Sequence, residues 1–411
     1  MKRFLHLVMI QSAAAGCLFC VAGLSAASSV TAKTDNWVAA WSAPPDSPGP
    51  AFQAQTLRQV LRSSVGGEAV RVRLSNLYGD RPLVIGEVHM ALHAQGSSIV
   101  PGSDLPLHFH GAAGTVIARG ESVLSDPLPM KVGALQELMV TMTLPVATGA
   151  STSHGVGNQT AYLVAGVKSP AAMEFHEEEV TSSRYFLTDL EVKVSERVAA
   201  IVILGDSVSD GVGSTQDGNK RWPDALADRL QGRAAFAVVN EGIAGNRILH
   251  DGVSPFIGSS ALSRMDRDVF AKPGVRWLVL VEGTNDITAS STLTVASEQV
   301  TSAQVIDGMR RIVARAHAKG VKVLAGTLPP FAGAEWPFHS AAGEVKRQAV
   351  NAWIRNGHAF DAVVDFDKTL RDPAHPDHLL QAFDSGDHIH PNDAGHKALA
   401  DAINLKDFGG G

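Results

Sequence analysis

From residue 198 to the end of the chain, short apolar runs alternate with segments long enough to form helices. The runs predict five buried strands, at 198–204, 236–239, 277–281, 321–327 and 362–366. The intervening segments predict helices at 222–230, 263–270, 302–319, 342–356 and 392–403. Strands separated by helices pair in parallel and carry helices on both faces. This half of the chain is therefore predicted to have a three-layer α/β/α fold.

Residues 37–190 show a different pattern, in which apolar and polar residues alternate with a period of two. The clearest examples are 70–74, 88–92 and 138–144, with turn-forming residues between them. Short alternating strands with frequent turns predict an antiparallel β-sandwich. At 411 residues the chain is also longer than one typical domain. We therefore expect a β-sandwich domain at 33–195 and an α/β domain at 196–411.

The first 32 residues have the composition of a secretory signal peptide. Lys2 and Arg3 precede the apolar segment 4–24, which is followed by small residues. An uncleaved membrane anchor and a lipoprotein cleavage box ending at Cys17 are the alternatives. We expect cleavage of residues 1–32, a secreted or periplasmic location, and no stable membrane insertion afterwards.

Composition argues against several classes of site and partner. Both cysteines, Cys17 and Cys20, lie in the leader, so the mature chain would have none for disulfides, catalysis or metal binding. The formal net charge is −6 without a block of basic residues, which argues against nucleic acid as a partner. His108 and His110 would place two imidazoles on one strand face, but a solvent-facing strand edge is favoured because no third ligand is evident. We expect neither a metal nor another cofactor.

A serine follows the first predicted α/β strand directly, where open α/β sheets place their active sites. The segment 205–211 reads Gly-Asp-Ser-Val-Ser-Asp-Gly, and Ser207 is its candidate nucleophile. Far along the chain, Asp387 precedes His390 by three residues. A serine nucleophile needs a base to take its proton and a third group to orient that base. In isolation Asp387 would be a turn residue and His390 a solvated loop histidine, but with Ser207 they predict a catalytic triad.

Two further strand ends carry groups that can stabilise an oxyanion. Gly245 follows the second strand, where a glycine lets a backbone N–H approach the reacting carbonyl. Asn285 follows the third strand, and its amide can donate a hydrogen bond. Each alone has a simpler interpretation, as a turn glycine or an Asx-turn. Suitable groups at three consecutive strand ends favour an acyl-transfer site.

In this order Ser207, Gly245, Asn285 and His390 resemble the four sequence blocks of the SGNH (GDSL-type) esterases and lipases. The resemblance covers about residues 196–405, and Val208, where leucine is commoner, is its one departure. The layout is also similar to an exported two-domain subgroup that carries a β-sandwich ahead of the hydrolase.

The resemblance implies a flavodoxin-like sheet and specific roles for the site residues. It makes Ser207 the nucleophile, His390 the base and Asp387 the acid that orients the base. It implies an oxyanion hole formed by the N–H groups of Ser207 and Gly245 with the Asn285 side chain. No Gly-x-Ser-x-Gly occurs in the chain, which excludes the nucleophile elbow of the α/β-hydrolases.

The sequence therefore predicts an exported serine esterase that hydrolyses carboxylic esters through an acyl-serine intermediate. The expected partners are small-molecule or polysaccharide esters, with short-chain or carbohydrate O-acetyl groups, because the loops after the strands are polar. A lipase or thioesterase of the same mechanism and a catalytically silent glycan-binding protein are the alternatives. Two loops, 246–258 and 329–343, are expected to shape the pocket. Their aromatic side chains either stack on a sugar or aryl ring of the substrate or only anchor the loops. The residues concerned are Arg247, His250, Phe256, Phe331, Trp336, Phe338 and His339.

Overall fold

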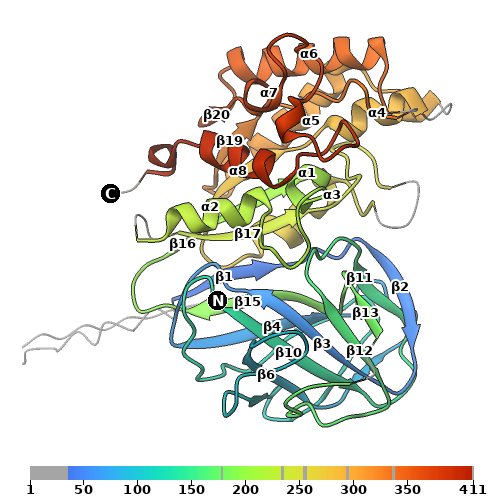
Figure 1. The fold of residues 1–411 in the computed structure, drawn as a ribbon, viewed down its shortest axis with the longest axis vertical. Helices are drawn as coiled ribbons and strands as arrows, with labels where there is room; N and C mark the ends of the chain where they lie inside the picture. The colour runs from blue at the N-terminus through green and yellow to red at the C-terminus, as the bar shows by residue number, and fades with distance from the viewer. Residues whose placement is uncertain are drawn as a thin grey trace, which may run out of the picture. The chain divides into compact units, whose positions relative to one another are not determined.

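A five-stranded parallel sheet forms the centre of the C-terminal half in the computed structural model (Figure 1). The structure describes residues 36–176, 179–232, 236–252, 257–292, 296–335 and 338–409. In spatial order the strands are β17 (Phe236–Gly242), β16 (Ala199–Gly205), β18 (Val275–Val281), β19 (Lys322–Gly326) and β20 (Ala362–Val364). The first of these strands in the sequence, β16, lies second in the sheet, between β17 and β18. This strand order is the flavodoxin-like one. The predicted parallel sheet is confirmed.

Helices cover both faces of this sheet. They are α1 (Ser207–Asp210), α2 (Trp222–Leu230), α3 (Ala261–Met265), α4 (Thr284–Thr292), α5 (Ser302–Ala318), α6 (Ala341–Asn356), α7 (Phe366–Leu370) and α8 (Asp393–Ala402). Shorter helical turns are Asp266–Phe270, Ala296–Glu298, Gln381–Phe383 and Leu405–Phe408. Val202 and Leu204 of β16 pack with α3, α5 and α6, whereas Ile201 and Ile203 pack with α2, α7 and α8. Successive residues of a strand point to opposite faces, so β16 contributes to two cores, as a three-layer fold requires.

Local signals set the helix starts. At the start of α5, the Thr301 hydroxyl accepts from the Gln304 N–H (3.2 Å), and the Gln304 side chain accepts from the Thr301 N–H (2.8 Å). This reciprocal pair is a capping box, which satisfies two helix-end donors. Asn392 caps α8, because its side chain accepts from the Gly395 N–H at 3.0 Å. The helix predicted to begin near residue 392 therefore begins beside the candidate base.

Antiparallel sheets make up the N-terminal half. Their strands are β1 (Trp37–Ser42), β2 (Ser47–Phe52), β3 (Gln55–Arg62), β4 (Ala69–Ser75), β5 (Leu83–Ile85), β6 (Val88–Leu92), β7 (Leu105–Leu107), β8 (Thr115–Ile117), β9 (Ser122–Leu124), β10 (Glu137–Leu144), β11 (Gly149–His154), β12 (Ala161–Ala165), β13 (Glu179–Thr181), β14 (Arg184–Tyr185) and β15 (Leu187–Lys193). The sheet orders are β1-β15-β4-β9, β13-β12-β3-β10-β6-β7, β14-β11-β2 and β5-β8. The alternating segments 70–74, 88–92 and 138–144 lie in β4, β6 and β10. Antiparallel pairing is confirmed, and the sandwich arrangement stays a prediction.

The antiparallel part (36–193) and the parallel part (199–409) share their apolar cores. Ala39 of β1 packs in the core that contains Val202, whereas Ala200 and Ala237 belong to the core of the antiparallel part. The Ala39 N–H also donates to the Pro273 carbonyl at 3.0 Å. Residues 36–411 form one compact unit. The predicted boundary at 195/196 falls between β15 and β16, and the division into two domains stays a prediction.

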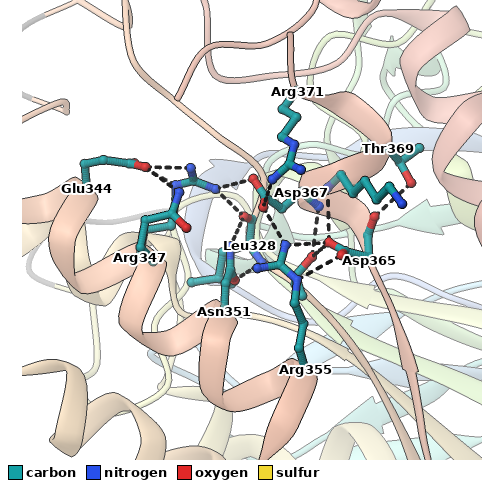
Figure 2. Close-up of polar contacts among 12 residues, drawn as sticks. Leu328, Glu344, Arg347, Asn351, Arg355, Asp365, Asp367, Thr369 and Arg371 are labelled. Carbon is teal, nitrogen blue, oxygen red and sulfur yellow. Dashed lines mark hydrogen bonds and ion pairs between the residues drawn. The ribbon is translucent and has the colours of Figure 1, made fainter. Parts of the chain in front are cut away.

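A buried network of charges fixes α6 to the segment after β20 (Figure 2). The Arg347 and Asp367 side chains are both fully buried, and Arg347 Nη1 lies 2.6 Å from Asp367 Oδ1. Arg347 Nη1 also donates to the Leu328 carbonyl at 3.0 Å, while Arg355 and Arg371 reach the second oxygen of Asp367. Buried charges are tolerated when they are paired and hydrogen-bonded in this way. The network therefore holds the loop after β19 in a defined position.

The predicted leader, residues 1–32, lies outside the described residues, which begin at residue 36. Within the described ranges, no helix combines the length and the apolar character needed to cross a bilayer.

Candidate active site

Ser207 lies at the start of a short helix that follows β16. Asp206 precedes this helix, and its carboxylate accepts from the Val208 N–H at 3.1 Å, as expected for an aspartate that braces the turn. The turn is crowded, because a Cβ on Gly205 would lie 2.6 Å from the Val281 carbonyl oxygen. Gly211 ends the helix with φ +111°, a conformation that favours glycine. The sequence Gly-Asp-Ser therefore holds the Ser207 hydroxyl at the carboxyl edge of the sheet.

The structure brings the three predicted triad residues together. His390 Nε2 lies 2.8 Å from Ser207 Oγ, although the two residues are 183 positions apart. On the other side of the ring, His390 Nδ1 lies 2.6 Å from Asp387 Oδ2. When Nδ1 donates its proton to the Asp387 carboxylate, Nε2 is left free to accept the Ser207 proton. The arrangement has the geometry that a serine nucleophile and its base require.

Asp387 is held ionised by its own turn. Its Oδ1 accepts the backbone N–H groups of His390 (2.8 Å) and Ile389 (3.1 Å). Partial burial acts to raise the pKa of Asp387, but the hydrogen bonds from the His390 ring and from these two N–H groups lower it to about 2. The carboxylate is therefore charged throughout the neutral and mildly acidic range, and it can orient the imidazole over that range.

The three predicted oxyanion groups line the same cleft as Ser207 and His390. Gly245 lies just after β17 with φ +79°, and among the described residues neither its N–H nor the Ser207 N–H has an acceptor. Asn285 lies in the first turn of α4, and its amide donates to the Asn246 carbonyl at 3.0 Å. An amide carries two N–H donors, so one remains for a substrate oxygen. Asn285 is therefore in a helical turn, not in the Asx-turn that was its simpler interpretation.

The cleft has a volume of about 640 Å³ and a mixed lining. This size falls within the range of small-molecule sites. Its walls outside the triad and the oxyanion groups are formed by Val212, Ala244, Gly333, Glu335, Phe338, Gly386, His388 and Ile389. His388 lies in this wall, and its Nδ1 is 2.5 Å from Asp384 Oδ2.

Only some of the loop residues expected to shape the pocket line the cleft. Phe338 lines the cleft and is 44% exposed. Phe331 is buried in the core, and Arg247 is buried against Glu298 at 2.5 Å, so both anchor their loops. His250 and His339 are not among the cleft-lining residues. Phe256 and Trp336 lie outside the described residues.

Sequence reasoning missed one buried histidine close to the nucleophile. His154, in β11 of the antiparallel part, lies 3.1 Å from Asp210 through its Nε2. The other oxygen of Asp210, Oδ2, accepts the N–H of Ala244 in the next loop, at 2.8 Å. No local pattern around His154 signals this contact, since β11 and α1 are far apart in the chain.

The described residues hold no group of three or more His, Cys, Asp or Glu side chains placed to bind a metal. The segment with His108 and His110 is not one strand face, because Phe109 and Ala112 form a tight bridge and His110 has φ +52°. Both histidines are exposed. The strand-face interpretation of this pair was therefore wrong.

The sequence of the parallel part of the chain is also similar to a known protein family. Residues 203–398 match the model of the GDSL-like Lipase/Acylhydrolase family. This match supports a GDSL-like hydrolase. The matched range begins in β16 and ends in α8, so it includes all five candidate site residues. Among curated proteins, none matches the sequence.

Several solved structures are similar to about half of the chain. The aryl esterase of M. smegmatis is 21% identical, with 50% of this chain and 96% of that chain covered and a TM-score of 0.40. A carbohydrate acetylesterase from Sinorhizobium meliloti is 18% identical, with coverage of 50% and 96% and a TM-score of 0.38. A carbohydrate acetylesterase family member from the same organism is 15% identical, with coverage of 50% and 95% and a TM-score of 0.40.

Proposed function

We propose that this protein is a serine esterase that hydrolyses carboxylic esters through an acyl-enzyme on Ser207. The observation that supports it best is the continuous chain of hydrogen bonds from Ser207 through His390 to Asp387. That chain opens into a cleft of small-molecule size that also contains Gly245 and Asn285. A nucleophile, its base, an orienting acid and oxyanion donors in one cleft are the parts that acyl transfer needs.

The proposed reaction has two half-reactions with the same proton carrier. Ser207 Oγ attacks the ester carbonyl carbon while His390 Nε2 takes the hydroxyl proton. The N–H groups of Ser207 and Gly245 and the Asn285 amide stabilise the oxyanion of the tetrahedral intermediate. His390 then gives its proton to the leaving alkoxide, and the alcohol departs. Water, deprotonated by His390, attacks the acyl-serine, and collapse of the second intermediate frees the carboxylic acid and restores Ser207.

We further propose that the substrates are short-chain esters or carbohydrate O-acetyl esters. The cleft wall combines polar groups, Glu335 and His388, with the apolar Phe338 and Ile389. The polar groups can accept and donate hydrogen bonds to hydroxyls of an alcohol moiety, and an exposed aromatic can stack on a sugar or aryl ring. A series of p-nitrophenyl esters from acetate to palmitate tests the acyl part, and acetylated polysaccharides test the alcohol part. A rate that rises with chain length would favour the lipase alternative.

The decisive experiment compares the wild-type protein with the Ser207→Ala variant. Turnover of p-nitrophenyl acetate and labelling by a fluorophosphonate are expected in the wild type and absent in the variant. The matched control is Ser209→Ala, which removes a buried hydroxyl from the same helix. Retained turnover in Ser207→Ala would refute the assignment of the nucleophile. Absence of labelling in the wild-type protein would favour a catalytically silent binding protein.

We also propose export to the periplasm or the medium, with residues 1–32 removed as a signal peptide. Lys2, Arg3 and the apolar segment that follows them support this proposal. N-terminal sequencing of the protein recovered from cell fractions tests it. An intact N-terminus on protein retained in the cytoplasm would overturn it.

A further inference from the structure

His154 connects the antiparallel part to the helix that carries the candidate nucleophile. It ends β11 and is 4% exposed. Its Nε2 lies 3.1 Å from Asp210 Oδ1, and its Nδ1 lies 3.4 Å from Asp46 Oδ2. Asp46 is itself held by the Ser47 hydroxyl (2.6 Å) and the Gly155 N–H (2.5 Å). The imidazole is therefore fixed between two buried carboxylates, one from each part of the chain.

Asp210 connects the helix of the proposed nucleophile with the loop of a proposed oxyanion donor. It is the last residue of α1, the helix that begins with Ser207. Its Oδ2 accepts the Ala244 N–H at 2.8 Å, and Ala244 directly precedes Gly245. The Asp210 carboxylate thus links the nucleophile helix to the loop that carries an oxyanion donor. A shift of Asp210 would change the distance between Ser207 and the Gly245 N–H.

Two other links from the antiparallel part reach this region of the chain, one at α1 itself and one at Ser214, after the helix. The Ser42 hydroxyl donates to the Asn240 carbonyl at 3.0 Å, and the Asn240 side chain donates to the Ser209 carbonyl at 2.7 Å. The Asn158 amide donates to the Ser214 hydroxyl at 2.5 Å. These links restrain the backbone around α1, whereas the His154 contact reaches α1 and the Gly245 loop together.

The charge of His154 suits this position. Burial lowers the pKa of His154, but the Asp210 and Asp46 carboxylates outweigh burial and raise it to about 10. The ring is therefore an imidazolium at neutral pH, and both ring nitrogens are donors. Replacing one partner of a buried pair leaves an uncompensated charge, so Asp210 would not keep its place without His154.

We propose that His154 is a positioning residue for catalysis, which holds Asp210 and through it sets the geometry between Ser207 and the Gly245 N–H. This inference rests on the proposed esterase function. It gives the antiparallel part a defined task, because that part supplies the side chain that aligns the nucleophile helix with the oxyanion loop. His154 does not touch the reacting atoms and takes no part in proton transfer.

The test measures kcat per active site in the full-length His154→Gln variant, with sites counted by fluorophosphonate titration. A loss of about 10–100-fold in kcat is expected with little change in KM, since a misplacement of about 1 Å remote from the chemistry can cost about 10²-fold. The matched control is His89→Gln, which removes another histidine–aspartate pair of the antiparallel part, His89–Asp104 at 2.7 Å. A loss of stability in both variants with unchanged kcat per titrated site would overturn the inference.

Two further variants keep the test decisive if His154→Gln folds poorly. Asp46→Asn removes one of the two carboxylates that hold the imidazole, and we expect a smaller fall in kcat in the same direction. In a double-mutant cycle, His154→Gln combined with Asp210→Asn should be about as slow as Asp210→Asn alone, because the two residues act as one unit. Additive losses would overturn the inference. Wild-type protein without Ser207-dependent ester turnover would instead overturn the proposed function, and the inference with it.

Discussion

The Asp387→Asn substitution tests how much an exposed carboxylate contributes to the proposed triad. Asparagine keeps the Oδ1 that accepts two backbone N–H groups, so the turn should persist. Its NH₂ group faces His390 Nδ1 and favours the wrong tautomer. The fall in the pKa of Asp387 from its ordinary 3.8 to about 2 is worth about 2.4 kcal/mol. This figure includes the two backbone N–H hydrogen bonds, which asparagine keeps, and the side chain is 47% exposed, so solvent screening lowers it further. The part lost on substitution is therefore about 1–1.5 kcal/mol.

We therefore expect Asp387→Asn to lower kcat about tenfold, since about 1.4 kcal/mol corresponds to a factor of ten. A triad with a buried carboxylate loses about 10⁴-fold on the same change. The assay is steady-state hydrolysis of p-nitrophenyl acetate at pH 7 to 8, with Asp377→Asn as the control. Asp377 pairs with His378 at 2.8 Å and is 44% exposed, but lies outside the cleft. A loss near 10⁴-fold would refute the screening argument, and an unchanged rate would show that His390 is oriented by another group.

Three other outcomes follow from the contacts. Asn285→Ala should lower kcat about 10²–10³-fold while fluorophosphonate still labels Ser207 in titrations, and an unchanged kcat would remove Asn285 from the oxyanion hole. Arg347→Met should cost about 3 kcal/mol in urea unfolding because it leaves Asp367 buried with fewer partners, whereas Lys397→Met, which removes an exposed pair, should cost less than about 0.5 kcal/mol. The His154 proton, with its pKa raised from 6.5 to about 10, stabilises the fold fully below pH 6.5, and this stabilisation is lost as pH rises through about 10. The difference in unfolding free energy between wild type and His154→Gln should therefore shrink from pH 6.5 to pH 10, and a constant difference would contradict a charged His154.

The parallel half was predictable because its signals are local. Each strand is an apolar run such as 198–204, found at Ala199–Gly205. The helix predicted at 222–230 is found at Trp222–Leu230. Helix-start signals such as Thr301 with Gln304 are also readable within a few residues. Parallel sheets bring their strand ends to one edge, so the residues after them were expected in one place.

For the antiparallel half, the sequence predicted the strands but not which strands pair with each other. The period of two at 138–144 identified a strand, but nothing in it specifies that β10 pairs with β3 and β6. The first and last strands of this half, β1 and β15, pair with each other across about 150 residues of chain. Such pairings depend on the packing of complete faces, which a local pattern does not contain.

The same distinction holds for the site. Ser207, Asp387 and His390 were identifiable because each lies beside a strand end or a helix start. His154 was not, because its partner Asp210 is in another part of the fold and a lone histidine in a strand carries no signal of its own. Long-range polar contacts are set by tertiary structure, and no local sequence pattern contains them.

Each part of the chain contributes small apolar residues to the core of the other part, and this limits how the protein can be shortened or recombined. Ala39 fills space beneath the parallel sheet, and Ala200 and Ala237 complete the core of the other part. A truncated hydrolase that starts after β15 would expose β16 and β17 residues to water, and we expect it to aggregate. Chimeras and minimal versions should therefore retain β1, or carry a redesigned surface in its place.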